Sequence, residues 1–277
     1  MGGHIGLDGR DGQDGDQPPP FFLALENWYL SGATVLGRRT AEMHTALAMA
    51  SGDAFAPELL GSRELDAVAR DMRAGAERSL DRLASALTAL DPSVRPLAET
   101  VLNGRETLLK RVDDIRTLAD AGLRIRVHGD YHLGQVLRTE EDFVIVDFEG
   151  DTSRPIAERR VKQSPVKDLS GMLRSFSYAA YAALFAFTVH APNDFDPLEP
   201  WAETWCHWVA RAFLRGYRGA LGPSPLLPAE DATETLLRAF TMEKALQELS
   251  YELTNRPEWI RIPLMGVKKL IDAGRAG

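Results

Sequence analysis

Two aspartates and a glutamine lie close together near the middle of the chain, within the sequences VHGDYHLGQVL and FVIVDFEGD. Asp130 follows a short apolar stretch, Gln135 lies five residues later, and Asp147 follows a run of β-branched residues. Mg²⁺ prefers a few oxygen ligands completed by water and substrate phosphates, so one carboxylate and one amide oxygen suffice to hold it. The remaining carboxylate, Asp130, is then available to orient an acceptor hydroxyl and take its proton. The pattern is typical of a phosphoryl-transfer site.

The segments that carry these residues have the composition of short strands. Alternating and β-branched residues predict strands over 124–127, 135–138 and 143–146, and the polar residues 139–142 predict a hairpin turn between the last two. Because a hairpin brings its two ends together, we expect Asp147 to lie near the loop that holds Asp130 and Gln135.

The rest of the chain shows helical periodicity from Phe21 onwards. Helices are predicted over 80–90, 97–121, 168–190, 199–220, 230–254 and 263–273, with Asp168 placed to cap the third of these. Residues 1–20 are rich in Gly, Asp and Pro, which predicts a flexible leader. We therefore expect an α+β, predominantly α fold, with a helical subdomain over 21–122, catalytic and metal loops over 123–166, and a helical part over 167–277.

Composition excludes several classes of function. The formal net charge of −8 and the pI of about 5.3 argue against a nucleic-acid-binding surface. The longest apolar stretch, 179–189, is too short to span a bilayer, and no signal-peptide pattern opens the chain. A single cysteine, Cys206, fits a reducing compartment. These features predict a cytoplasmic protein with no membrane or nucleic-acid partner.

The motif H-G-D-x-x-x-x-Q, followed by a strand and D-F-E, resembles the catalytic and metal loops of the aminoglycoside-phosphotransferase-like branch of the protein-kinase-like superfamily. Two longer segments, RPIAERRVKQSPVKDLSGML and EKALQELSYELTNRPEWIRIPL, are similar to the C-terminal lobe of bacterial maltokinases. Those kinases occur alone or fused to trehalose synthase.

This resemblance implies an ATP-dependent maltokinase that makes maltose 1-phosphate and ADP in trehalose and glycogen metabolism, with Mg²⁺ as cofactor. It assigns Asp130 as catalytic base and Gln135 with Asp147 as Mg²⁺ ligands. Glu149 is a further metal-ligand candidate. His128 and Asp168 take structural roles in the same loops.

The resemblance also places maltose binding in the helical lobe. Lys244, Glu248, Tyr251 and Glu252 fall on one face of a predicted helix, and Arg256 follows. An aromatic face suits a sugar ring, and charged groups suit its hydroxyls. The alternative interpretation of this face is an ordinary charged helix surface. The basic stretch 154–167 is likewise either a solvated loop or a contact for ATP phosphates or sugar.

A kinase of this superfamily also needs an N-terminal β lobe with a phosphate-covering loop and a Lys–Glu pair. Residues 21–121 show no strand-rich stretch, so we expect that lobe to be missing here or supplied by a separate chain, and the isolated chain to have little kinase activity. Two alternatives from other classes stay open: a non-catalytic module that binds maltose or trehalose synthase, and a related kinase with another small acceptor. A two-metal hydrolase built on His128, Asp130 and His132 needs more ligands than the sequence offers.

Overall fold

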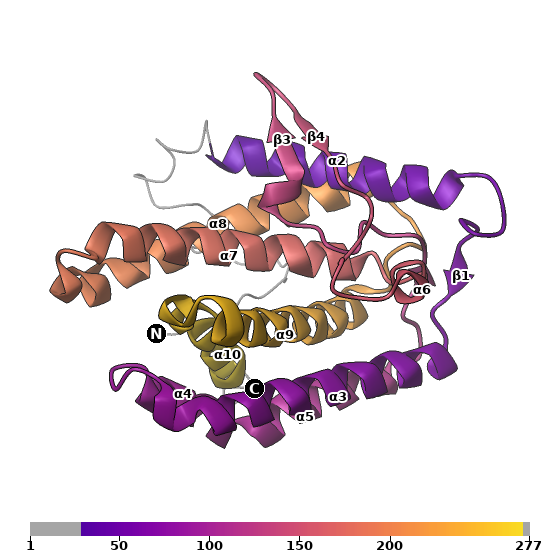
Figure 1. The fold of residues 1–277 in the computed structure, drawn as a ribbon. Coiled ribbons are helices and arrows are strands. Elements are labelled where there is room, and N and C mark those ends of the chain that lie inside the picture. Colours follow the sequence, from indigo (N-terminus) through magenta and orange to yellow (C-terminus); the bar gives the residue numbers. More distant parts are fainter. Residues whose placement is uncertain (1–28, 274–277) are drawn as a thin grey trace. The chain divides into compact units, whose positions relative to one another are not determined.

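The computed structural model describes residues 29–273, and the predicted leader, residues 1–20, lies outside this range. The described chain is mainly helical with four short strands, which confirms the α+β, predominantly α class. Its main elements, drawn in Figure 1, are α2 (Tyr29–Met49), β1 (Glu58–Leu59), α3 (Ser62–Ala86), α4 (Arg95–Asn103), α5 (Arg105–Asp114), β2 (Leu123–Arg124), β3 (Val136–Arg138), β4 (Phe143–Ile145), α6 (Ile156–Arg159), α7 (Val166–Thr188), α8 (Phe195–Leu221), α9 (Glu230–Asn255) and α10 (Arg261–Ala273). Among these described helices, none is both long enough and apolar enough to cross a membrane.

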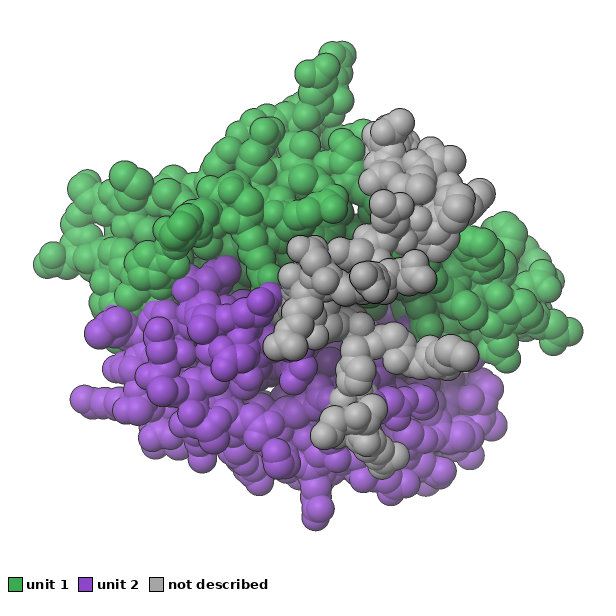
Figure 2. Space-filling model, turned by 180° about the vertical axis from the view of Figure 1, so that it is seen from behind, with its two compact units in different colours: residues 1–58, 123–226 green, residues 59–122, 227–277 purple. Residues whose placement is uncertain are grey.

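The chain forms two compact units, each built from separate stretches of sequence (Figure 2). Unit 1 contains residues 1–58 and 123–226, and unit 2 contains residues 59–122 and 227–277. The units cut across the division into 21–122, 123–166 and 167–277 that the sequence suggested. Helix α2 belongs with the loops around Asp130, and the C-terminal helices belong with α3 to α5.

In unit 1, helix α2 packs along α8, and α7 packs against α8 (Figure 1). Phe176 of α7 makes edge-to-face contacts with Trp205 and Phe213 of α8, with ring centroids 6.5 and 5.6 Å apart. Such contacts add stabilisation to the area that the rings bury. These three helices form the apolar support behind the loops of residues 125–150.

The hairpin of unit 1 follows the sequence pattern closely. Strands β3 and β4 pair antiparallel, with Val136 opposite Ile145 and Arg138 opposite Phe143. The turn closes through a bond from the Thr139 N–H to the Asp142 carbonyl, 2.8 Å, and one from the Asp142 N–H to the Thr139 hydroxyl, 3.0 Å. The predicted strands 135–138 and 143–146 are confirmed. The predicted strand 124–127 is shorter, because only β2 and a bridge between Ile125 and Gln163 form there.

In unit 2, α3 packs against α5 and α9, and α10 packs against α4 and α9. The buried apolar side chains of α3, spaced three or four residues apart, are Leu65, Ala69, Met72, Ala76, Leu80 and Leu83. This spacing is the apolar stripe of an amphipathic helix. Ser79 of the same helix is also buried, and its hydroxyl lies 2.8 Å from that of Ser250 in α9.

The predicted single helix over 97–121 is wrong. The structure divides this region into α4 and α5, with Gly104 between them, and ends α5 in a 3-10 turn over Ile115–Thr117. A Cβ at Gly104 would lie 2.4 Å from Cδ1 of Ile271 in α10. The absence of a side chain at Gly104 therefore leaves room for Ile271, a tertiary contact that local periodicity does not encode.

Two glycines set the spacing between α2 and α8. A Cβ on Gly37 would lie 2.0 Å from the Phe213 carbonyl oxygen, and one on Gly216 would lie 2.1 Å from the Thr34 carbonyl oxygen. Backbone atoms cannot yield as a flexible side chain does. The two helices therefore approach each other as closely as they do only because these positions lack a side chain.

We predict that Gly37→Ala lowers the free energy of unfolding by about 2 kcal/mol or more, because the added methyl group forces the helices apart. The matched control is Gly219→Ala in α8, where the space around the position is open. That change should be neutral or slightly stabilising, since Ala favours helix over Gly. Urea unfolding of both variants measures the difference, and equal stabilities would contradict the close approach.

Candidate active site

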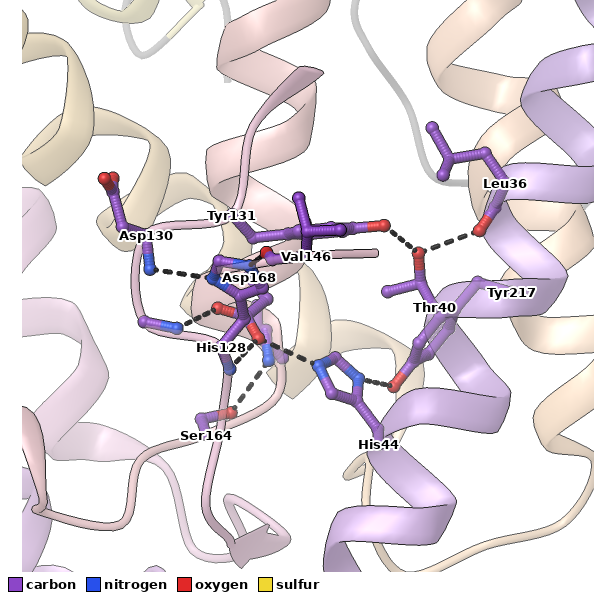
Figure 3. A network of polar contacts seen from close by, with 12 residues as sticks. Leu36, Thr40, His44, His128, Asp130, Tyr131, Val146, Ser164, Asp168 and Tyr217 are labelled. Atoms are coloured by element: carbon purple, nitrogen blue, oxygen red, sulfur yellow. Dashed lines mark hydrogen bonds and ion pairs between the residues drawn. The ribbon is translucent and has the colours of Figure 1, made fainter. Parts of the chain in front are cut away.

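The carboxylate of Asp168, buried in the first turn of α7, holds the loop of residues 128–130 in place (Figure 3). Its Oδ2 accepts the His128 backbone N–H at 2.7 Å, and its Oδ1 accepts the Gly129 N–H at 2.9 Å. The helix begins after Pro165, and Asp168 lies inside the first turn without acting as its N-cap. The structural role in the loops that the sequence predicted for Asp168 is therefore present, whereas the predicted helix cap does not form, because the carboxylate oxygens are directed to the loop.

The third partner of Asp168 is His44 of α2, whose Nε2 lies 3.1 Å from Oδ2. Burial by itself raises the pKa of Asp168. The hydrogen bond and charge of His44 and the Gly129 N–H outweigh it, so the pKa lies below its usual value. Asp168 is thus a carboxylate at neutral pH, and His44 Nε2 donates to it.

His44 is a residue that the sequence did not single out. It is completely buried, and its Nδ1 lies 2.9 Å from the hydroxyl of Tyr217 in α8. Burial raises the pKa of Tyr217, so its hydroxyl keeps its proton. The chain Tyr217–His44–Asp168 joins three helices to the loop (Figure 3). No local pattern marks His44, because its partners lie more than a hundred residues away in sequence.

The ring of His128 connects the loop to the end of β4. Its Nε2 lies 2.8 Å from the Val146 carbonyl oxygen, and its Nδ1 accepts the Asp130 N–H at 3.4 Å. A carbonyl only accepts, so Nε2 carries the proton and Nδ1 is the acceptor. Between them, Gly129 has a φ of 85°, a left-handed conformation that favours glycine. His128 therefore sets the position of Asp130 relative to the residue that precedes Asp147.

Asp130 directs its carboxylate away from the Asp168 network (Figure 3). Its Oδ2 lies 3.6 Å from Nε2 of His132. The next residue, Tyr131, is buried instead, and its hydroxyl lies 2.8 Å from the Thr40 hydroxyl of α2. The Asp130 carboxylate is thus directed away from the Asp168 network, while the neighbouring backbone is fixed by it.

Gln135 and Asp147, the two predicted metal ligands, contact each other. The side-chain Nε2 of Gln135 lies 2.9 Å from Asp147 Oδ2. The backbone N–H of Val146 donates to the backbone carbonyl of Gln135 at 3.0 Å. Asp147 has a φ of 65°, a costly conformation for a residue other than glycine. The hairpin thus brings together two side chains that are twelve residues apart, and backbone strain is concentrated at one of them.

Glu149 lies with a different partner. Its Oε2 is 3.3 Å from Nη1 of Arg159, which also donates to the Glu149 carbonyl at 3.0 Å. Within residues 29–273, no group of three His, Cys, Asp or Glu side chains is arranged to hold a metal ion.

A bidentate ion pair attaches the hairpin turn to α2. Arg39 Nε lies 2.7 Å from Asp142 Oδ1, and its Nη2 lies 2.5 Å from Oδ2. The Arg39 hydrogen bonds lower the pKa of Asp142 to about 2. The forked geometry fixes direction as well as distance. Helix α2 therefore supports both the loop, through His44, and the hairpin, through Arg39.

The residues predicted to bind sugar lie on α9 and just after it, in unit 2. Tyr251 is exposed, and the Arg256 guanidinium lies over its ring, 5.3 Å from the centroid. Glu252 is buried and contacts Nη2 of Arg256 at 2.6 Å. Lys244 and Glu248 are partly exposed. Glu252 and Arg256 thus stabilise the end of α9, while the other three present surface.

Solved structures of glucosamine kinases have a similar fold. One crystal form matches with a TM-score of 0.68 and 24% identity, covering 88% of this chain and 53% of that one. A glucosamine kinase in complex with glucosamine, ADP and inorganic phosphate matches with a TM-score of 0.65 and 25% identity, covering 85% and 53%.

Sequence relatives agree. A glucosamine kinase of Mycolicibacterium smegmatis is 30% identical over 250 residues, which are 88% of this chain and 55% of the relative. A glucosamine kinase of Streptacidiphilus jiangxiensis is 29% identical over 243 residues, 86% of this chain and 49% of the relative. The chain thus spans about half the length of the relatives it matches. No family model matches it.

These findings contradict the assignment to the maltokinases and to the protein-kinase-like superfamily, because the relatives are glucosamine kinases. Maltose, trehalose synthase and a role in trehalose or glycogen metabolism have no support among them. The maltokinase resemblance rested on the segments 154–173 and 243–264. Similarity over such segments does not by itself identify the sugar that a kinase phosphorylates.

We predict that Asp168→Asn lowers the free energy of unfolding at pH 7 by roughly 3 kcal/mol, because it removes a buried charge whose partners stay buried. Asp196→Asn, in the exposed first turn of α8, is the matched control and should change stability by less than about 0.5 kcal/mol. Chemical unfolding of both variants tests this, and similar losses would show that Asp168 holds nothing in place.

The same carboxylate predicts a pH dependence. Because the folded-state pKa of Asp168 is below the unfolded value of about 3.9, its stabilisation is complete at neutral pH. It is lost as the pH falls below about 4 and through the folded-state pKa. We therefore expect the difference in unfolding free energy between wild type and Asp168→Asn to narrow from pH 7 to pH 3.5. A constant difference over that range would rule out the ionised carboxylate as its source.

Proposed function

We propose that this chain acts in the ATP-dependent phosphorylation of a sugar, with glucosamine as the acceptor. Its similarity to glucosamine kinases over most of its length supports both parts of the proposal. The observation that carries it is the anchored loop, which holds Asp130 beside the hairpin end bearing Gln135 and Asp147. A charged base and a pair of oxygen ligands in adjoining loops suit phosphoryl transfer.

In the proposed reaction, Asp130 orients an acceptor hydroxyl and takes its proton. The hydroxyl oxygen then forms a bond to the γ-phosphorus of ATP while the bond to the bridging oxygen breaks, and ADP leaves with that electron pair. The Asp168 network fixes the backbone of Asp130, so that the carboxylate meets the hydroxyl with little reorganisation. His128 fixes the position of Asp130 relative to the hairpin.

The residues at the hairpin fit a magnesium ion. Asp147 offers a carboxylate, and rotation of the Gln135 amide would present its carbonyl oxygen in place of the NH₂ group that contacts Asp147. When bound there, Mg²⁺ neutralises charge on the phosphates. Two protein ligands are enough, because Mg²⁺ usually keeps several waters and substrate oxygens. Glu149, held by Arg159, stays outside this set.

We propose Lys244, Glu248 and Tyr251 of α9 as a sugar-contacting surface of unit 2. Tyr251 presents an exposed ring face, which suits the apolar side of a sugar. The carboxylate of Glu248 suits the ammonium group that an amino sugar carries at neutral pH. Glu252 and Arg256 contribute by fixing the end of the helix.

The central prediction concerns Asp130. In a version of this chain completed by the part of the Mycolicibacterium smegmatis glucosamine kinase that it does not match, supplied with ATP, Mg²⁺ and glucosamine, Asp130→Asn should lower the rate of ADP release by about 10² to 10⁴-fold, because an amide does not accept the proton. Asp196→Asn, an exposed aspartate on α8, is the control and should keep the wild-type rate. Unchanged turnover in Asp130→Asn would show that another group is the base.

The acceptor is tested by calorimetric titration of the same chain with glucosamine, maltose and Mg²⁺–ATP, each separately. We expect a saturable heat with glucosamine and a much weaker one, or none, with maltose. Tighter binding of maltose would overturn the choice of acceptor. Absence of binding to both sugars and to Mg²⁺–ATP would overturn the proposed function for this chain.

A further inference from the structure

A basic cavity lies within unit 1, and the proposed reaction does not use it. Its volume is about 420 Å³, and its lining includes four cationic side chains, Arg124, Arg126, Arg160 and Lys162. The single carboxylate in the lining is Glu58, and Phe55 provides an apolar wall. The cavity is partly open to solvent, and its volume lies within the range of pockets that bind small molecules.

The charges in the lining do not cancel. Glu58 is already engaged by two of the cations, with Lys162 Nζ at 2.6 Å from Oε1 and Arg124 Nη2 at 2.7 Å from Oε2. Lys162 also donates to the carbonyls of Asp53 and Ala56, at 2.8 and 2.7 Å. Four cations against one carboxylate leave a formal charge of +3 on the lining, in a chain whose net charge is −8.

Backbone contacts place the two remaining arginines on the same wall. The Ile125 N–H donates to the Gln163 carbonyl at 2.9 Å, and the Gln163 N–H donates back at 2.8 Å. Arg126 also donates through Nη1 to the Arg160 carbonyl. The segments 124–126 and 160–163 are thus tied together, and each contributes guanidinium groups to the cavity.

The cavity accounts for part of the basic stretch 154–167. Arg154 contacts Asp151 at 3.5 Å, and Arg159 contacts Glu149 at 3.3 Å, so these two cations have acidic neighbours in sequence. Arg160 and Lys162 line the cavity instead. The stretch is therefore divided between local ion pairs and one concave basic surface.

We propose that this cavity is a second ligand site, which binds the phosphate group of a small phosphorylated metabolite through Arg126 and Arg160. The forked guanidinium matches phosphate oxygens, and two of them on one wall favour a dianion over a halide or carboxylate. The volume exceeds that of inorganic phosphate, and Phe55 offers contact to an attached sugar-sized group. The site shares no residue with Asp130, Gln135 or Asp147.

The test is calorimetric titration of the full chain with inorganic phosphate and with glucose 6-phosphate, at constant ionic strength. We expect both to bind, and Arg126→Gln/Arg160→Gln to weaken binding by roughly tenfold or more, since charge-assisted hydrogen bonds are lost. Arg38→Gln/Arg215→Gln removes the same charge from the exposed surface of α2 and α8 and is the matched control. The single variant Arg160→Gln, at an exposed side chain, guards against a folding defect in the double variant.

Each outcome decides the proposal. Equal weakening of phosphate binding in the control variant would show non-specific attraction and overturn the proposal. Unchanged phosphate binding in both Arg160→Gln and the double variant would also overturn it. Phosphate binding should persist without Mg²⁺, and its loss when Mg²⁺ is removed would place the anion at the proposed transfer site and overturn the second site. Tighter binding of glucose 6-phosphate than of phosphate would identify an organic phosphate as the ligand, and equal affinity would identify inorganic phosphate.

Discussion

The buried carboxylate of Asp168 is the interaction on which the site depends. A charge in the core is costly unless it is fully bonded, and here the partners come from different parts of unit 1: two backbone N–H groups of the loop and the ring of His44. Tyr217 holds that ring from α8. The loop therefore takes its conformation only when α2, α7 and α8 are packed. The close approach at Gly37 and Gly216 is part of the same requirement, since it sets where α2 carries His44.

In this arrangement, the groups that fix the loop differ from the side chain that is proposed to react. The backbone N–H groups of His128 and Gly129 donate to Asp168, while Asp130 directs its carboxylate away from the network. His128 transmits the constraint further, because one ring nitrogen contacts the loop and the other contacts the residue before Asp147. Arg39 attaches the far end of the hairpin to the same helix that carries His44. Both loops of the proposed site are thus held in position by α2, although α2 contributes no group to the proposed reaction.

The sequence predicted what depends on neighbours in the chain. Periodicity located the hairpin and α7 to α9, and residue chemistry grouped Gln135 with Asp147. The sequence-based prediction was wrong where contacts between residues far apart in the chain determine the local structure. The contact of Gly104 with Ile271 and the role of His44 beside Asp168 and Tyr217 both join residues far apart in the chain. The acceptor was wrong for a different reason: similarity over the segments 154–173 and 243–264 did not identify the sugar.

Charge imposes a further constraint that joins the two proposals. A chain with a net charge of −8 repels phosphate anions at long range, although salt screens that repulsion beyond about 10 Å. Phosphate binding then relies on local charge. At the hairpin the two predicted ligands are a carboxylate and an amide, so the proposed reaction would need a metal ion to supply the positive charge. At the cavity, arginines supply it directly. We therefore expect phosphate binding at the hairpin to depend on a metal ion and phosphate binding at the cavity to be independent of it. Removal of magnesium should abolish binding at the hairpin and leave binding at the cavity.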